Sequence, residues 1–172
     1  MKIIFLSCLI AVLAIGCSSP KNNTESSNET ATESEKFAPP PNENYFMQGT
    51  DGTYYYLEEL KGKKVFINYW ATWCKPCIAE MPDIQAAAEI LEKEGYVFFL
   101  VSDQEMDKIM KFEKDKEFNL TFAKLNGKIQ DLKIQSLPTT EIYTTTGKRV
   151  QKIAGAVKWD SEGMLKSLRA VE

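Results

Sequence analysis

The sequence contains no histidine, and this absence excludes several kinds of active site. Without an imidazole there is no Ser-His or Cys-His nucleophilic pair and no histidine-ligated metal. The 4 cysteines do not replace it, because a zinc site needs four good ligands and only two thiols stand close together. The sequence therefore predicts no metal site.

A block of basic charge is also missing. The 172 residues include 21 Lys and Arg against 24 Asp and Glu, and the charges are dispersed along the chain. Binding to a nucleic acid backbone needs a basic patch or stripe, so no nucleic acid partner is expected. Long apolar runs are scarce too: the run Ile3–Ile15 is too short for a membrane-spanning helix.

That short apolar run has the form of an export signal. Lys2 provides a positive start, the apolar run follows, and Gly16 precedes Cys17. The segment Leu13-Ala14-Ile15-Gly16-Cys17 resembles a bacterial lipobox, although leucine is usual where Ala14 stands. We expect residues 1–16 to be a lipoprotein signal peptide and Cys17 to carry the lipid. An ordinary secretory signal with an incidental cysteine is the alternative.

The composition changes twice after the signal segment. Residues 17–44 are rich in Ser, Thr, Asn, Glu and Pro and cannot bury enough apolar surface to fold, which predicts a disordered tether. Residues 45–172 have the composition of one globular domain with one core. The pattern predicts a folded domain that a flexible segment holds clear of a membrane surface.

Two thiols remain for chemistry in that domain, because Cys8 lies in the signal segment and Cys17 is assigned to the lipid. Cys74 and Cys77 form a Cys-x-x-Cys motif where a strand-like run gives way to a helix-like one. Free N–H groups and the dipole at a helix start favour the thiolate, so we expect Cys74 to attack and Cys77 to resolve the mixed disulfide. A static disulfide is the alternative.

Hydrophobic periodicity predicts strands that alternate with helices. We expect a hairpin from 45–47 and 53–57, strands at 65–70, 96–102, 120–124, 140–145 and 149–154, and helices at 76–94, 106–117, 128–134 and 159–171. This order predicts an α/β fold with a central mixed sheet, helices on both faces and an N-terminal β-hairpin extension.

The segment Asn68-Tyr-Trp-Ala-Thr-Trp-Cys-Lys-Pro-Cys-Ile-Ala-Glu-Met-Pro82 resembles the TlpA/ResA-like, membrane-tethered branch of the thioredoxin superfamily. The resemblance covers nearly all of 45–171 and implies a thioredoxin-like fold, with the redox-active disulfide and no other cofactor. Ser136-Leu137-Pro138-Thr139 resembles the loop whose proline is cis in this superfamily. By resemblance, Leu137 offers its main chain to an incoming polypeptide and Pro138 flanks Cys74.

Two positions differ from ordinary thioredoxins, which carry a buried aspartate on the strand before the motif. Here that position is Asn68, which cannot take a proton. Members of the TlpA/ResA-like branch often have an acid three residues after the second cysteine, and this chain has Glu80 there. We expect Glu80 to relay the proton that Cys77 loses. A favourable interaction of Glu80 with the helix dipole is the competing explanation.

The residues next to the cysteines have expected supporting roles. We expect Trp73 to cover the sulfur atoms as an apolar lid and Trp70 to pack beneath the motif. Pro76 suits a first helical turn, and Lys75 would lower the pKa of Cys74 if its ammonium points toward the sulfur. A solvated Lys75 without effect is the alternative.

The resulting hypothesis is a monomeric, lipid-anchored thiol-disulfide oxidoreductase in the periplasm or on the outer cell surface of a bacterium. The resemblance implies that it reduces disulfides of exported proteins, including apocytochromes c, with electrons from a membrane thiol donor. A disulfide-forming oxidant and a non-catalytic binding module stay open. A thioredoxin-fold peroxidase also stays open, although its arginine partner would have to be Arg149 or Arg169, both far from the motif in sequence.

Overall fold

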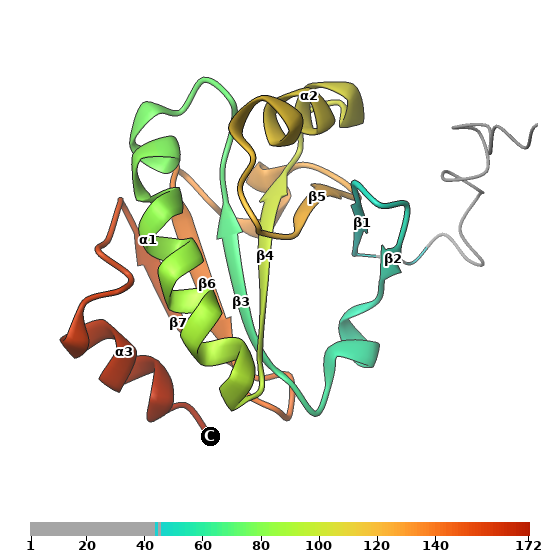
Figure 1. Ribbon diagram of the computed structural model, residues 1–172. Helices are drawn as coiled ribbons and strands as arrows, with labels where there is room; N and C mark the ends of the chain where they lie inside the picture. The colour runs from blue at the N-terminus through green and yellow to red at the C-terminus, as the bar shows by residue number, and fades with distance from the viewer. Residues whose placement is uncertain (1–43, 45) are drawn as a thin grey trace, which may run out of the picture. The chain divides into compact units, whose positions relative to one another are not determined.

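Seven strands form one mixed sheet in the computed structural model, which describes residues 44 and 46–172 (Figure 1). The predictions for the signal segment 1–16 and for Cys17 lie outside the described residues, as does the tether up to residue 43. The domain start at 45 consequently stays a prediction.

The strand order is β2-β1-β5-β4-β3-β6-β7. In chain order the strands are β1 (Met47–Gly49), β2 (Tyr54–Tyr55), β3 (Lys64–Tyr69), β4 (Tyr96–Ser102), β5 (Phe122–Leu125), β6 (Thr139–Tyr143) and β7 (Arg149–Ala154). Strands β3, β4 and β5 run parallel to one another, whereas β6 is antiparallel to β3 and β7 is antiparallel to β6. Strand β3 lies inside the sheet, between β4 and β6, and a short loop leads from its last residue to the Cys-x-x-Cys motif.

The N-terminal hairpin is present and extends the sheet. Strands β1 and β2 pair antiparallel, and β1 also pairs with β5. The turn between β1 and β2 has Gly52 at φ 91°, a left-handed backbone that glycine adopts without a steric penalty. The hairpin is therefore an edge extension of the central sheet, as the sequence predicts.

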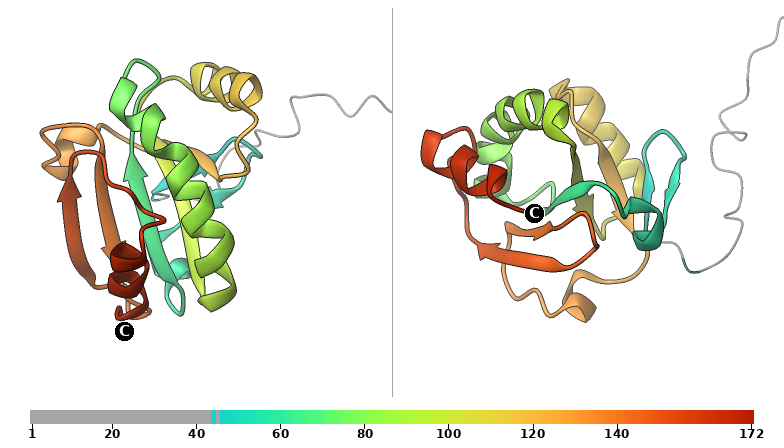
Figure 2. Two further views of the ribbon diagram at one scale, coloured as in Figure 1. Left: turned by 60° about the vertical axis from the view of Figure 1, so that its left-hand side comes forward. Right: turned by 90° about the horizontal axis from the view of Figure 1, so that it is seen from below.

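Helices cover the two faces of the sheet unequally. The helices α1 (Lys75–Leu91), α2 (Met106–Lys116) and α3 (Glu162–Arg169) all contribute buried side chains to one core cluster with Phe66 and Trp70. On the opposite face, a second cluster around Ile67 and Tyr69 is closed by the 3-10 helices η1 (Leu57–Leu60) and η3 (Ile129–Leu132). Figure 2 shows α1 and α3 side by side on their face of the sheet.

Most elements differ from the prediction by a few residues at their ends, and the last two helices differ most. The helix expected at 128–134 is the single turn η3, which ends where Lys133 adopts φ 57°. The terminal helix begins at Glu162 rather than at 159, because Ser161 has an extended backbone and serves as its N-cap residue. Helix α1 continues into the 3-10 turn η2 (Glu92–Glu94), and Gly95 closes this turn.

Candidate active site

The two cysteines lie at the N-terminus of α1 and form a disulfide, with their Cα atoms 5.3 Å apart. Cys74 is the N-cap residue, and its sulfur accepts a hydrogen bond from the backbone N–H of Cys77 at 3.3 Å. That N–H is one of the groups that a helix start leaves without an internal partner. The sulfur of Cys74 therefore sits where a negative charge would be stabilised.

Both cysteines are buried, but not to the same extent. Cys74 is 4% exposed and Cys77 is fully buried. Lys75 and Pro76 are exposed on the first turn of α1, and Pro76 takes one of the first two helical positions, where its missing N–H has no cost. Cys74 keeps a small exposed area that Cys77 lacks, and the order of attack, with Cys74 first, stays a prediction.

The two tryptophans near the motif have opposite environments. Trp70 is fully buried and packs against Phe112 and Phe122, with ring centroids 4.6 and 5.3 Å away. It belongs to the core cluster that also holds both cysteines. Trp73 is 71% exposed, so most of its ring faces solvent. The structure places Trp73 beside Cys74 as an exposed apolar surface, and its role as a lid stays a prediction.

Gln104 holds the loop between β3 and the Cys-x-x-Cys motif by two hydrogen bonds. Its side-chain oxygen accepts from the backbone N–H of Thr72 at 2.7 Å, and its amide nitrogen donates to the Thr72 hydroxyl at 3.1 Å. Gln104 comes from the loop after β4, which runs beside β3. This two-point contact fixes the backbone directly before Trp73 and Cys74.

The proline loop reaches the same end of the sheet by strand register. Thr139, the first residue of β6, lies opposite Tyr69, the last residue of β3. Pro138 precedes Thr139, is buried and follows a cis peptide bond from Leu137, in agreement with the resemblance. Leu137 is partly buried and packs against both core clusters. The register therefore brings this loop beside the segment that leads to the cysteines.

Asn68 and Glu80 are in direct contact inside the protein. Asn68 is fully buried on β3, and its amide nitrogen donates to Glu80 Oε1 and to Thr140 Oγ1, both at 2.9 Å. The other side-chain atom of Asn68, Oδ1, is buried without a hydrogen-bond partner among the described residues. Glu80 is 3% exposed, so it is a buried carboxyl rather than a surface acid near a helix start.

A segment far along the chain completes the surroundings of Glu80. Residues 155–161, which we call the strap, connect β7 to α3. The backbone N–H of Val157 and the indole N–H of Trp159 both donate to Glu80 Oε2, at 2.9 and 3.0 Å. The strap also contacts the proline loop, because the N–H of Gly155 donates to the carbonyl of Pro138 at 2.9 Å. The strap thereby joins the proline loop to the buried carboxyl.

Burial raises the pKa of Glu80 above its ordinary value of 4.5, and the nearby charge of Asp83 acts in the same direction. The hydrogen bonds from Val157, Asn68 and Trp159 lower the pKa but do not cancel the effect of burial. A carboxyl with a raised pKa can take and return a proton closer to neutral pH than an exposed glutamate can.

Glu80 should make the oxidised protein less stable as the pH rises. The folded protein holds the Glu80 proton more tightly than the unfolded chain, so its favourable contribution is complete below pH 4.5 and is lost as the pH rises through the folded pKa. Between these limits the free energy of unfolding falls by at most about 1.4 kcal/mol per pH unit because of Glu80. The measurement is the free energy of urea unfolding across this pH range, for the wild type and for Glu80→Gln.

The comparison with Glu80→Gln cancels the titration of every other carboxyl. Glutamine can be accommodated, because a flip of the Asn68 amide turns its Oδ1 toward the new side-chain nitrogen, while the Thr140 hydroxyl donates instead of accepting. If the two stability curves run parallel, the carboxyl does not titrate differently in the folded state.

Among residues 44 and 46–172 no group of three or more His, Cys, Asp or Glu side chains could hold a metal ion. No helix in the same part of the chain is long and apolar enough to cross a membrane. The contacts described above assemble the disulfide, the buried carboxyl with its donors, and the proline loop.

Three residues of this site were missed from the sequence, namely Gln104, Thr140 and Trp159. Each contacts the site through a side chain that comes from an element distant in sequence. For Trp159 a signal existed, because a tryptophan in an otherwise polar stretch before a helix suggests a buried contact. For Gln104 and Thr140 the sequence holds no comparable signal.

Comparisons with known proteins agree with this geometry. Residues 39–137 match the model of the AhpC/TSA family. The thiol-disulfide oxidoreductase ResA of Bacillus cereus is 33% identical over 129 residues, which cover 73% of this chain and 75% of that protein. The protein of the same name from Oceanobacillus iheyensis is 36% identical over 117 residues, covering 65% of this chain and 60% of that one.

Solved structures show the same fold. The exposed lipoprotein thioredoxin of Streptococcus pneumoniae superposes with a TM-score of 0.65 at 26% identity, covering 74% of this chain and 98% of that one. A thiol:disulfide interchange protein of Chlorobium tepidum gives a TM-score of 0.60 at 21% identity, covering 74% of this chain and 94% of that one. The second likeness bears on the fold alone. Together with the disulfide and the flanking helices, both agree with a thioredoxin-like architecture.

Proposed function

Because this chain belongs to the AhpC/TSA family and, within it, to the ResA-like thiol-disulfide oxidoreductases, we propose that it reduces disulfides of exported proteins outside the bacterial cytoplasm. The observation that carries this proposal is the Cys74–Cys77 disulfide at the start of α1, with Cys74 as the N-cap residue and Cys77 fully buried. Apocytochromes c are one class of substrate that the family likeness suggests.

The proposed reaction begins with the reduced pair. The Cys74 thiolate attacks one sulfur of the substrate disulfide, a new S–S bond forms, and the other substrate sulfur leaves with the electron pair. Cys77 then loses its proton and attacks the sulfur of Cys74. The mixed disulfide breaks, the second substrate thiolate leaves, and the substrate has gained two electrons. The protein ends in the disulfide form present in the structure.

Glu80 is the proposed acceptor of the Cys77 proton. It lies one helical turn after Cys77, is buried, and has a raised pKa. Asn68, which occupies the position of the aspartate of ordinary thioredoxins, holds Glu80 by a hydrogen bond at 2.9 Å. The buried Asn68–Glu80 pair thus supports a proton route that differs from that of ordinary thioredoxins.

The exposed surface around Cys74 supports a polypeptide as substrate. Trp73 presents an apolar ring, and the main chain of Leu137 before Pro138 is the proposed strand-like contact for the substrate backbone. Such a contact recognises the main chain of the substrate more than its side chains, because backbone N–H and C=O groups are common to all peptides. The proposed substrate class is therefore extended or unfolded segments that carry a disulfide.

The proposed location is the outer side of a bacterial membrane, with lipid on Cys17 as the anchor and residues 17–44 as the tether. The motif at Leu13–Cys17 supports the anchor, and the likeness to an exposed lipoprotein thioredoxin supports the compartment. A protein that gives electrons to exported substrates must be reduced again there, so a membrane thiol donor is the proposed source.

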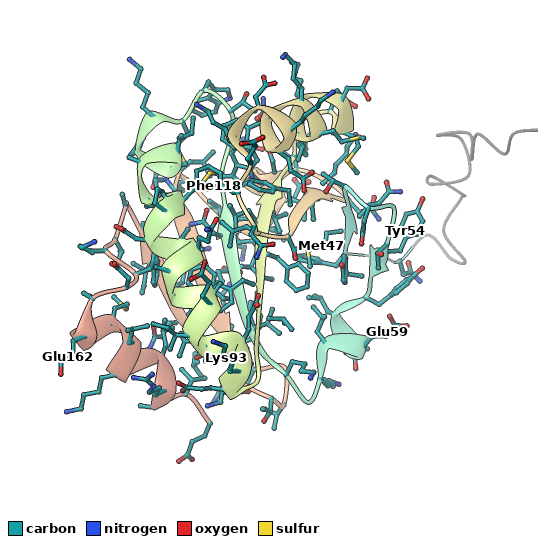
Figure 3. All side chains as sticks on the ribbon, viewed as in Figure 1. Met47, Tyr54, Glu59, Lys93, Phe118 and Glu162 are labelled. Carbon is teal, nitrogen blue, oxygen red and sulfur yellow. A yellow bond between two sulfur atoms is a disulfide. The ribbon has the colours of Figure 1, made fainter. Side chains whose placement is uncertain are left out.

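A peroxidase is a weaker candidate for this chain, because its two arginines lie at the wrong end of the fold. Arg149 pairs with Glu141 and stands opposite Tyr143, at the end of the sheet away from the cysteines. Arg169 pairs with Glu94, at the end of α1 where Figure 3 labels Lys93. Neither guanidinium is placed to activate a peroxide at Cys74.

The reduction potential of the pair should lie near or below about −270 mV, the value of thioredoxin. A reductant must hold its electrons weakly enough to pass them to substrate disulfides in an oxidising compartment. The measurement is equilibration of the purified protein in dithiothreitol or glutathione buffers, with alkylation of Cys74 and Cys77 as the readout.

Two results would contradict the proposed direction. A potential near about −120 mV is typical of a strong oxidant and would make the protein a disulfide-forming enzyme. A pair that stays oxidised in every buffer would instead indicate a structural bond.

A further inference from the structure

The strap determines which oxygen of Glu80 can accept a proton. Each carboxylate oxygen offers two lone pairs. Oε2 uses both, one for the N–H of Val157 at 2.9 Å and one for the indole N–H of Trp159 at 3.0 Å. Oε1 accepts one hydrogen bond, from Asn68. A single free lone pair therefore remains among the contacts of the described residues, and it belongs to Oε1.

We propose that Trp159 is a positioning residue of the thiol-disulfide exchange, whose indole N–H occupies Oε2 of Glu80 and leaves Oε1 as the proton-accepting atom. The inference rests on the proposed function, since it requires Glu80 to receive the proton of Cys77. The strap is thus part of the proton route, although it lies about eighty residues from the cysteines in sequence.

The proton transfer accompanies the exchange of sulfur–sulfur bonds. The S–H bond of Cys77 breaks, its proton binds Oε1 of Glu80, and the electron pair stays on sulfur. That sulfur forms the bond to the sulfur of Cys74, and the thiolate of the substrate leaves with the electron pair of the broken mixed disulfide. During this step Oε2 keeps its two donors, so the carboxyl does not have to rotate to become protonated.

Apolar packing alone does not explain why position 159 carries an indole rather than a phenyl ring. Trp159 is fully buried and meets the ring of Phe66 edge-on, with centroids 4.8 Å apart. A phenyl ring could make such an apolar contact. The indole adds an N–H group, and this group is directed at the carboxylate of Glu80 rather than at a backbone carbonyl. A hydrogen bond to an ionised acceptor is stronger than one to a neutral group.

The charged groups around Glu80 come from α1 and from the strap. Asp83, on α1, raises the pKa of Glu80, and the ammonium of Lys158 pairs with Asp83 at 3.0 Å and with Asp160 at 2.9 Å. The side chain that contacts Glu80 from β3 is the neutral Asn68, which in turn contacts the neutral Thr140 of β6. Lys158 therefore fastens the strap to α1 and offsets the charge of Asp83.

The test compares the full-length wild type with Trp159→Phe, each reduced beforehand, with insulin as the probe substrate. The second-order rate of reduction is measured from about pH 4 to about pH 9, where the inflection of Glu80 should appear. Loss of a donor to the carboxylate raises its proton affinity, so we expect the inflection to move upward by about one pH unit. The plateau rate above the inflection should change little.

Tyr96→Phe is the matched control. Tyr96 lies in the same core cluster as Trp159, and its hydroxyl donates a buried hydrogen bond to the carbonyl of Leu168 at 2.6 Å. The variant loses this hydrogen bond, which does not involve Glu80. The inflection in the pH profile of the Tyr96→Phe reduction rate should stay at the wild-type pH. If Trp159→Phe lowers the rate by the same factor at every pH, Trp159 has only a structural role and the inference is wrong.

Two further variants keep the result decisive. Benzothienylalanine at position 159 keeps the shape of the indole and replaces its N–H by sulfur, so it decides the matter if Trp159→Phe does not fold. Glu80→Gln tests the role of Glu80 apart from that of Trp159. An unchanged pH profile in Glu80→Gln overturns the proposed role of Glu80 itself. Loss of the inflection in Glu80→Gln, with no shift in either Trp159 variant, overturns only the inference.

Discussion

Replacement of Cys74 by serine should reduce disulfide exchange by about a thousandfold or more, because a serine hydroxyl is not ionised near neutral pH and cannot form a mixed disulfide. Cys77 is not expected to take over the attack, since it is fully buried whereas Cys74 keeps a small exposed area. The described part of the chain holds no third thiol. The measurement is the rate of insulin reduction by the variant, after complete reduction with dithiothreitol.

The matched variant is Cys77→Ser, which should fail at a different step. Cys74 can still attack, but nothing resolves the product, so a mixed disulfide with the substrate should accumulate and be visible by mass spectrometry. Equal loss without any trapped species would contradict the assigned order of attack. Peroxide turnover that survives in Cys74→Ser would exclude Cys74 as a peroxidatic thiol, and turnover that depends on Cys74 would support the peroxidase alternative.

Trp70→Ala should lower the free energy of unfolding by about 3–5 kcal/mol. Its side chain is fully buried between β3 and α2, where it packs against Phe112 and Phe122. The indole nitrogen has no hydrogen-bond partner among the described residues, so the whole loss comes from apolar contacts and from the cavity left behind. Urea unfolding of the oxidised protein at constant pH measures this loss.

Trp73→Ala provides the internal control, three residues further along the same loop. Its ring is 71% exposed, and removal should change the stability by no more than about 0.5 kcal/mol. The same variant should weaken the reduction of a polypeptide more than the reduction of a small disulfide, because only a polypeptide spans the surface beside Cys74. A large loss of stability in Trp73→Ala would show that Trp73 is a packed lid after all.

The sequence predicts the parts of the fold whose signals are local. The strand 96–102 was predicted with the bounds that β4 has, because a continuous apolar run between Gly95 and a polar loop leaves little choice of ends. The helix start at the cysteines was placed within one residue, since a proline in the first turn marks such starts. The pairing of the N-terminal hairpin followed from its glycine-containing turn in the same way.

The remainder depends on contacts between distant segments. The local pattern predicts a helix that begins at Trp159, whereas in the structure Trp159 is buried in the core and its indole N–H donates to Glu80. A buried carboxyl that needs donors outweighs one turn of helix propensity. Gln104 and Thr72, which are joined by hydrogen bonds, lie 32 residues apart in sequence. Their contact depends on β4 lying beside β3, and no local pattern reveals this pairing.

Separate parts of the chain provide the nucleophile and its surroundings. The cysteines stand on α1, whereas the strap between β7 and α3 contacts both Glu80 and the carbonyl of Pro138. A graft of residues 155–161 from another member of the family would therefore change the working pH range and the presentation of the proline loop together, with both thiols untouched. A change confined to residues 155–161 would thus alter the surroundings of Glu80 while the Cys-x-x-Cys motif stays the same.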